Sequence, residues 1–157
     1  MRNLKIKILD NGIGLPLPKY ESSGAAGLDL MAAIKENQKI LISPGKAEMI
    51  PSGIAITIPE GFEAQIRPRS GLASKNGITV LNSPGTIDSD YRGEILIMLI
   101  NHSKKKFEIS RGMRIVQMVI SKIEQFNLIS VDELGMTNRG KDGFGSTGSW
   151  TKNDKRW

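Results

Sequence analysis

Short segments that are rich in apolar residues, many of them alternating with polar ones, recur along this chain. They lie at residues 4–9 (LKIKIL), 28–32 (LDLMA), 54–58 (IAITI), 63–68 (EAQIRP), 95–100 (ILIMLI) and 107–110 (FEIS). Alternation with a period of two is typical of strands that bury one face and expose the other. Gly or Pro falls between most of the segments and favours turns there. This pattern predicts an all-β fold, either a sandwich or a closed barrel.

Two segments need separate treatment. Residues 113–134 contain no Gly or Pro, so their length alone allows a helix. Their central part, RIVQMVISKI, is rich in β-branched apolar residues, which favour a strand. The one short helix that we expect spans residues 70–77 (SGLASKNG), with Ser70 as a possible cap and Gly77 to end it.

Length and composition limit the class of protein. The chain has 157 residues, enough for one domain with a substantial core, and its 39% apolar content argues against wholesale disorder. A net charge of +6 suits nucleic acid, an anionic membrane or a small polyanion, or reflects no more than a basic surface. The only run of three basic residues is Lys104–Lys106, and no basic amphipathic helix is apparent.

Several kinds of chemistry are excluded. The chain has no cysteine, so it has neither disulfides nor Cys-ligated zinc. His102 is the only histidine and precedes Ser-Lys-Lys-Lys, which indicates a turn and leaves no paired-histidine metal site. The N-terminus has no apolar signal-peptide core, and the run at 95–100 is far below the roughly 18 residues that span a bilayer. We therefore expect a soluble protein of the cytoplasm that does not bind membranes.

A glycine-rich stretch near the C-terminus, RGKDGFGSTGSW, includes a G-x-G-x-x-G match at residues 143–148. A dinucleotide-binding loop opens a helix and has an acidic residue about 20 positions later, but here only residues 149–157 follow. A Walker loop is excluded because no G-K-[ST] tripeptide occurs. We instead interpret the stretch as an arm whose backbone N–H groups, hydroxyls and Arg139 are suited to bind an anion. Its Phe144 is either incidental or lies across a flat ligand.

Two further clusters combine charge with turn residues. Arg67 and Arg69 lie beside Ser70 at the start of the expected helix, which suits a phosphate, although surface arginines beside a capping serine are more common. The segment GTIDSDYRGEI places Asp88, Asp90 and Glu94 close together along the chain. Such carboxylates either serve a divalent metal or an activated water, or accept backbone hydrogen bonds in a hairpin turn.

Two polar residues lie in apolar surroundings. Asp29 follows small and apolar residues in AAGLDL and needs a partner such as an arginine if it is buried. Gln117 falls between apolar residues of an expected strand, so its amide either faces solvent or reaches into a site. Arginines, carboxylates, hydroxyls and glycine loops together suit a Mg²⁺-assisted site for a phosphorylated ligand.

The order and the residues of five segments resemble those of a known family. AGLDL, RPRSGLA, GTIDSDYRGEI, GMRIVQM and RGKDGFGSTG look like the five ordered motifs of the trimeric dUTP diphosphatases, or dUTPases, and extend from residue 25 to 148. That family hydrolyses dUTP to dUMP and pyrophosphate with Mg²⁺, which keeps uracil out of DNA and supplies dUMP for thymidylate synthesis. The resemblance implies a jelly-roll-type β-barrel (the dUTPase-like β-clip) in a homotrimer whose active sites are shared between subunits.

The resemblance also implies catalytic roles. Asp88 matches the carboxylate that activates water for in-line attack on the α-phosphorus, with Mg²⁺ on the phosphate oxygens. An aspartate is ionised at neutral pH and accepts a proton weakly, so positioning and charge neutralisation must supply most of the rate. Asp29 matches a residue of the polar network around the phosphates and the metal. No direct metal ligand from the protein is expected.

Substrate-binding roles follow by position. Tyr91 matches the tyrosine that packs under the sugar and excludes a ribose 2′-hydroxyl. Asn82, together with the backbone of the Val80–Asp90 hairpin, matches the segment that reads uracil, and Ser83-Pro84 is a local variation within it. Phe144 matches the ring that stacks over uracil. The remaining implied substrate contacts are Arg69, Ser70, Gly71, Thr86, Ile87, Gln117, Arg139, Gly145, Ser146 and Thr147.

The resemblance suggests two parts of the chain: a β-barrel domain at residues 1–138, and a flexible glycine-rich arm and tail at residues 139–157. It implies dUTP as substrate and no stable binding of nucleic acid. Alternatives are a dCTP deaminase or bifunctional deaminase–diphosphatase of the same superfamily, and a non-catalytic nucleotide-binding module. The full IDSDYRGEI string and the C-terminal arm argue against the deaminases, and the intact Asp88 argues against the module.

Overall fold

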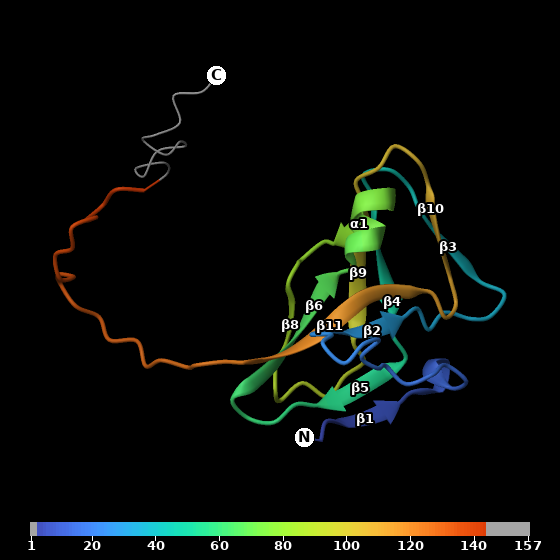
Figure 1. The fold of residues 1–157 in the computed structure, drawn as a ribbon, viewed down its shortest axis with the longest axis horizontal. Coiled ribbons are helices and arrows are strands. Elements are labelled where there is room, and N and C mark those ends of the chain that lie inside the picture. The colour runs from blue at the N-terminus through green and yellow to red at the C-terminus, as the bar shows by residue number, and fades with distance from the viewer. Residues whose placement is uncertain (1–2, 144–157) are drawn as a thin grey trace. The chain divides into compact units, whose positions relative to one another are not determined.

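The structure, a computed structural model that describes residues 3–143, consists mainly of β-strands (Figure 1). Its elements follow in the order β1 (Lys5–Ile8), η1 (Asp10–Gly12), β2 (Leu28–Met31), β3 (Lys39–Ile42), β4 (Ala47–Pro51), β5 (Ile54–Thr57), β6 (Phe62–Pro68), α1 (Ser70–Asn76), β7 (Ile78–Val80), β8 (Gly85–Ile87), β9 (Leu96–Asn101), β10 (Phe107–Ser110) and β11 (Arg114–Lys122). The chain divides into two units, Met1–Glu124 and Gln125–Trp157. All the strands named here belong to the first unit.

The strands that the alternating pattern predicts are present. The ambiguous segment after residue 113 forms β11, a strand and not a helix, as its β-branched residues indicate. The pattern does not indicate β3, β4, β7 or β8. Strands β7 and β8 have three residues each, which is too short for a period of two to be visible.

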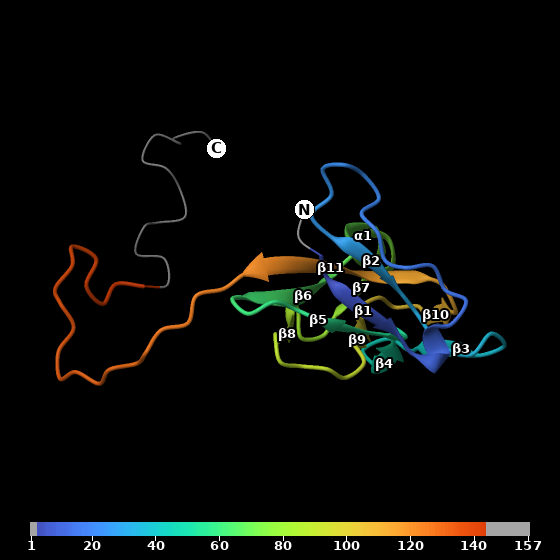
Figure 2. The same ribbon diagram turned by 90° about the horizontal axis from the view of Figure 1, so that it is seen from below.

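The strands pair in antiparallel fashion in four sheets (Figure 2). The largest has the order β2-β11-β6-β8, and a second has the order β4-β9-β7. The pairs β1-β5 and β10-β3 complete the set. Strand β11 lies between β2 and β6, so Gln117 is opposite Asp29 on one side and opposite Arg67 on the other. This register brings segments far apart in the sequence to one place.

The core consists of the inward side chains of these strands. In β9, Ile97 and Leu99 are fully buried while Met98 between them is partly exposed, which is the physical origin of the alternation in the sequence. Leu30, Ile109 and Val116 are also fully buried. Burial of each such side chain stabilises the fold by about 1.5–3 kcal/mol.

The short helix α1 forms where expected, but its start differs from the prediction. Ser70 is its first residue and not its cap, because Arg69 occupies the cap position in extended conformation and makes no side-chain cap bond. The helix ends at Gly77, whose φ of 64° is left-handed and whose N–H bonds to the Ala73 carbonyl. Figure 1 shows α1 at the end of this unit opposite β1 and β5.

The second unit contains no strand or helix over its described residues, 125–143. Several of its apolar side chains are almost fully exposed, including Leu128 at 96% and Met136 at 102%. The boundary that the resemblance suggests, between residues 138 and 139, stays a prediction. Across the described part of the chain, no helix has both the length and the apolar character to cross a membrane.

Candidate active site

An ion-pair network around Asp29 is the most strongly organised polar feature of the first unit. Asp29 lies on β2, and its side chain is only 14% exposed. Arg69 Nε lies 3.1 Å from Asp29 Oδ1, and Arg114 Nη1 lies 3.2 Å from Asp29 Oδ2. Arg69 Nη1 also donates to the Arg114 carbonyl oxygen at 3.0 Å. The prediction that Asp29 needs an arginine partner is confirmed, and two arginines supply it.

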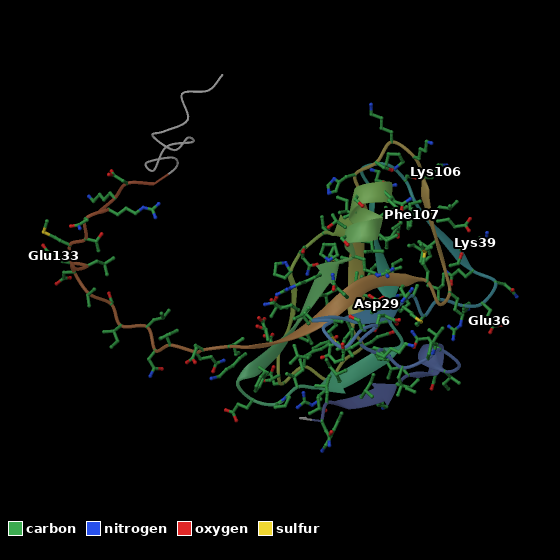
Figure 3. The ribbon with its side chains drawn as sticks, in the orientation of Figure 1. Asp29, Glu36, Lys39, Lys106, Phe107 and Glu133 are labelled. Carbon is green, nitrogen blue, oxygen red and sulfur yellow. The ribbon has the colours of Figure 1, made fainter. Side chains whose placement is uncertain are left out.

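Asp29 and Arg69 line a cavity of about 400 Å³, which we call the Arg69 cavity. Figure 3 labels Asp29. The lining of the cavity comprises Asp29, Arg69, Ser70, Gly71, Leu72, Lys75, Asn76 and Gln117. The structure thus brings together the predicted site residues of the first, second and fourth motifs. Lys75 and Asn76 were not among the predicted site residues. Lys75 is four positions after Gly71 and Asn76 is four positions after Leu72, and this helical spacing is the signal that places them beside the cavity lining.

Gln117 reaches into this cavity, which decides between the two interpretations of its amide. Its Nε2 donates to the Pro68 carbonyl at 3.0 Å, which holds the side chain across the sheet. A Cβ atom at Gly27 would lie 2.6 Å from Gln117 Oε1. The glycine of the AGLDL segment therefore leaves room for the glutamine that lines the cavity.

The two arginines of RPRSGLA diverge. Arg69 faces the cavity, whereas Arg67 is exposed and its Nε donates to Gln65 Oε1 at 2.9 Å. Arg67 lies outside the lining of the Arg69 cavity, so of the two arginines only Arg69 lies at this cavity. Successive strand residues point to opposite faces, so residues 67 and 69 share a face only while the strand stays regular. Here the extended chain ends at Pro68 and the helix begins.

The segment of the third motif lies at β8. Thr86 is opposite Gln65 and Ile87 is opposite Ala64, so this segment extends the sheet on the far side of β6. The expected Val80–Asp90 hairpin is not formed, because β7 pairs with β9 and β8 pairs with β6. The chain crosses from one sheet to another between them. Asn82 lies at this crossing, where a Cβ on Gly85 would come within 3.3 Å of its Nδ2.

Tyr91 is fixed in a turn after β8. Its N–H donates to the Asp88 carbonyl at 3.2 Å, and its hydroxyl donates to the Glu94 carbonyl at 2.9 Å. Tyr91 is 43% exposed. Asp88 is also exposed, so its carboxylate is accessible to water.

Glu94 has a structural role that the sequence did not indicate. Its Oε1 accepts the Gly53 N–H at 2.7 Å and Asn11 Nδ2 at 2.8 Å. The interpretation of Asp88, Asp90 and Glu94 as a joint metal site is not supported. Within residues 3–143, no group of three or more His, Asp or Glu side chains is arranged to hold a metal ion.

The two groups of site residues are separated within one chain. Ile87 is opposite Ala64 on β6, and from Ala64 to Arg69 the extended chain covers roughly 16 Å at the usual rise per residue. Asp88 and Tyr91 follow Ile87 in the direction away from Arg69, since β6 and β8 are antiparallel. Within one chain, the pairing of β6 and β8 therefore directs Asp88 away from the Arg69 cavity.

The second unit holds the remaining predicted residues. Arg139 Nε donates to the Asp142 carbonyl at 2.9 Å, which closes a local turn. Phe144, Gly145, Ser146 and Thr147 lie outside the described residues, so their predicted contacts stay predictions.

Comparison with known proteins decides the family. The sequence profile of the dUTPase family matches residues 14–148. This chain belongs to the dUTPase family. The resemblance in the five ordered motifs is thereby confirmed.

Curated relatives of this dUTPase-family chain are similar over nearly their whole length. The deoxyuridine 5′-triphosphate nucleotidohydrolase of Rhizobium rhizogenes is 59% identical over 140 residues, covering 89% of this chain and 90% of that protein. The protein of the same name from Neorickettsia sennetsu is 57% identical over 145 residues, covering 92% and 96%. Among solved structures, a mutant dUTPase of Staphylococcus bacteriophage 80alpha with dUpNHpp has a TM-score of 0.81 and 26% identity, covering 94% and 99%.

Proposed function

We propose that this chain hydrolyses dUTP to dUMP and pyrophosphate by attack of water on the α-phosphorus. The observation that carries this proposal is the Arg69 cavity, in which the partly buried carboxylate of Asp29 holds Arg69 beside residues of three dUTPase motifs. Membership of the dUTPase family and the activity named for its relatives support the same reaction. The reaction limits incorporation of uracil into DNA and supplies dUMP for dTMP synthesis.

The cavity has the chemistry that a triphosphate requires. Arg69 offers donors next to the hydroxyl of Ser70 and the backbone of Gly71, and charge-assisted hydrogen bonds of this kind hold phosphates firmly. Asp29 engages Arg69 through Nε and thereby fixes the plane of the guanidinium. Gln117 and Arg139 complete the proposed set of phosphate contacts, together with Ser146 and Thr147 of the arm.

Asp88 acts as the general base in this proposal. Its exposed carboxylate takes a proton from the attacking water, while the donors around the phosphates stabilise the charge that develops in the transition state. Tyr91, held through its hydroxyl, presents its ring to the deoxyribose and leaves no room for a 2′-hydroxyl. Uracil is recognised by Asn82 together with the backbone of Thr86 and Ile87. Phe144 stacks over the base.

The described residues fit a Mg²⁺ ion that is held chiefly by substrate phosphates and water. Both carboxylate oxygens of Asp29 are engaged by arginines, and no cluster of three acidic or histidine side chains occurs within residues 3–143. Mg²⁺ usually keeps several waters and binds through few protein carboxylates, so this donor set suits it. When bound, Mg²⁺ neutralises charge on the phosphate oxygens. Asp29 contributes by positioning Arg69 of the phosphate site.

The active site is proposed to be shared in a homotrimer of jelly-roll subunits. Two observations support this. Ile87 is opposite Ala64, and the extended chain from Ala64 to Arg69 covers roughly 16 Å. The apolar side chains within residues 126–136 are exposed. A second copy can place its Asp88 and Tyr91 at the Arg69 cavity of the first. Exposed apolar segments of this kind are usually covered by a partner chain.

A substrate panel tests the proposed reaction. The protein is incubated with Mg²⁺ and dUTP, dCTP, dTTP or UTP in turn, and pyrophosphate and ammonia are followed. We expect pyrophosphate from dUTP alone. Ammonia from dCTP would identify a deaminase of the same superfamily, and the absence of turnover with all four nucleotides would favour a binding module.

A further inference from the structure

A second basic cavity lies next to the Arg69 cavity and has no role in the function proposed above. It has a volume of about 370 Å³ and is lined by Lys75, Asn76, Ser103, Lys104, Lys105, Lys106 and Phe107. We call it the lysine pocket. Lys75 and Asn76 of α1 line both cavities, so the two cavities adjoin along one side of this helix. Figure 3 shows Lys106 and Phe107 at the same end of the unit as α1.

The lysine pocket carries uncompensated positive charge. Its four lysines are exposed, and none of them forms an ion pair among the described residues. No described residue of its lining is acidic. The neighbouring Glu108 is engaged by Lys39, with Nζ 2.7 Å from Oε1. A cation at Lys75 is favourable beside the C-terminal end of α1, but that effect does not explain three further lysines.

The turn that carries the three lysines is held rigidly. Asn101 is fully buried, and its Nδ2 donates to the carbonyls of Ile42 and Lys105, both at 2.8 Å. Its Oδ1 accepts the Ser103 N–H at 2.9 Å, and Ser103 Oγ donates to the Lys105 carbonyl at 2.9 Å. This network fixes the backbone of the turn, so binding an anion here costs side-chain ordering but no loop ordering.

The turn is also fixed against α1. The His102 N–H donates to the Gly77 carbonyl at 2.8 Å, directly after the last helical residue. A Cβ on Gly77 would lie 2.9 Å from the Ser103 nitrogen, so the two segments are in close contact. The distance between the lysine turn and the Arg69 cavity is therefore set by the fold.

We propose that the lysine pocket is a second polyphosphate-binding site, which captures the triphosphate of the substrate before it enters the Arg69 cavity. The ligand class follows from the size of the pocket, its charge of four lysines and the shared wall with the Arg69 cavity. Clustered charge of one sign raises the local concentration of an oppositely charged ligand and its rate of association. The kinetic part of this inference rests on the proposed function, whereas the binding of a polyphosphate does not.

Inorganic tripolyphosphate provides a test that requires no turnover. Its binding to the full chain is measured by calorimetry at low salt, in the unsubstituted protein and in the Lys104→Gln/Lys105→Gln/Lys106→Gln variant. We expect the apparent affinity to fall about tenfold in the variant, since three charges close to the ligand are lost. A matched control, Lys5→Gln/Lys7→Gln/Lys35→Gln, removes the same charge from exposed positions elsewhere and should change the affinity less than about twofold. Replacing the three turn lysines by arginine should retain the affinity.

The kinetic arm measures kcat and kcat/KM for dUTP over a range of salt. In the turn variant we expect a lower kcat/KM, a shallower dependence on salt and an unchanged kcat, which a merely structural role would not produce. Equal effects in both triple variants, or unaltered tripolyphosphate binding in the turn variant, would overturn the proposal. It is also wrong if the turn variant loses binding of a single-stranded oligonucleotide but keeps that of tripolyphosphate. If the unsubstituted protein does not hydrolyse dUTP, the proposed function fails while the binding arm still decides this inference.

Discussion

At the scale of single residues, Asp29 and Gln117 line the Arg69 cavity, and specific contacts hold both side chains. Asp29 is nearly buried and balanced by Arg69 and Arg114, so its charge is compensated within the fold. Removal of one partner from such a group leaves an uncompensated charge, which is costly. The partners of Asp29 come from different segments of the chain, Arg69 before α1 and Arg114 on β11.

The first residue-scale prediction concerns Gly27. In Gly27→Ala the new Cβ would meet Gln117 Oε1 at 2.6 Å and Gln117 Cβ at 3.1 Å, so the amide must leave its bond to Pro68. We expect a loss of about 1 kcal/mol in the free energy of unfolding and a higher KM for dUTP. Gly24→Ala is the matched control, because nothing lies within 4 Å of the corresponding Cβ. Denaturant titration and steady-state kinetics check both, and identical behaviour of the two variants would contradict the role of Gly27.

The second residue-scale prediction concerns Asp88. Asp88→Asn keeps the size of the side chain but cannot accept the proton of the attacking water. We expect turnover of dUTP to fall at least ~100-fold, the usual scale for a lost general base, with dUTP binding nearly unchanged. Asp10→Asn removes a different exposed carboxylate and should leave turnover intact. Single-turnover kinetics and calorimetric binding measure the two quantities, and near-normal turnover of Asp88→Asn would refute the assignment.

At the scale of secondary-structure elements, the turn after β8 is tied to the body of the first unit by one side chain. The Glu94 carboxylate bonds to Gly53 and Asn11, and the Glu94 carbonyl accepts the Tyr91 hydroxyl. Glu94 thus connects η1, the loop at Gly53 and the turn that presents Tyr91. These contacts position the turn that carries Tyr91.

We predict that Glu94→Ala lowers the free energy of unfolding by about 2–4 kcal/mol, because it removes both hydrogen bonds and leaves the Gly53 N–H without its acceptor. The freed turn should also weaken discrimination between dUTP and UTP, since Tyr91 is proposed to exclude the 2′-hydroxyl. Glu94→Gln keeps an acceptor oxygen and should retain most of the discrimination. The control is Glu36→Ala, because Glu36 is exposed and forms no ion pair or side-chain hydrogen bond within the described part of the chain. Thermal unfolding and the ratio of kcat/KM values measure these effects, and an unchanged ratio in Glu94→Ala would argue against a positioning role.

At the scale of the whole molecule, the question is how the separated groups of site residues meet. The register of β6 and β8 keeps Asp88 away from Arg69 within one chain, and Arg139 belongs to the second unit. The homotrimer proposed above would bring such groups together through symmetry. Each proposed site would then take residues from more than one chain.

A mixing experiment tests this arrangement. Asp88→Asn and Arg139→Gln should each be nearly inactive alone, because each removes one proposed group from every site. The two variants are unfolded and refolded together, so that their chains assemble at random. We expect on the order of a quarter of the sites to regain activity, because these sites receive an intact Asp88 from one chain and an intact Arg139 from another. Sedimentation checks the oligomeric state. Recovery that does not exceed the sum of the separate variants would show that each site belongs to a single chain.

The sequence by itself determined the strands with a clear alternation, the extended conformation of β11, the requirement of Asp29 for an arginine and the membership of the family. These properties depend on the burial of one face of a strand or on the order of local motifs, both of which are present in short stretches of residues. Only the tertiary structure decided that Arg69 and Arg114, and not Arg67, meet Asp29. It also placed β7 and β8 in different sheets and brought Lys75 against the lysine turn. The physical reason is that such partners are set by antiparallel register between distant segments, as for Arg69 and Arg114, which are 45 positions apart in the chain.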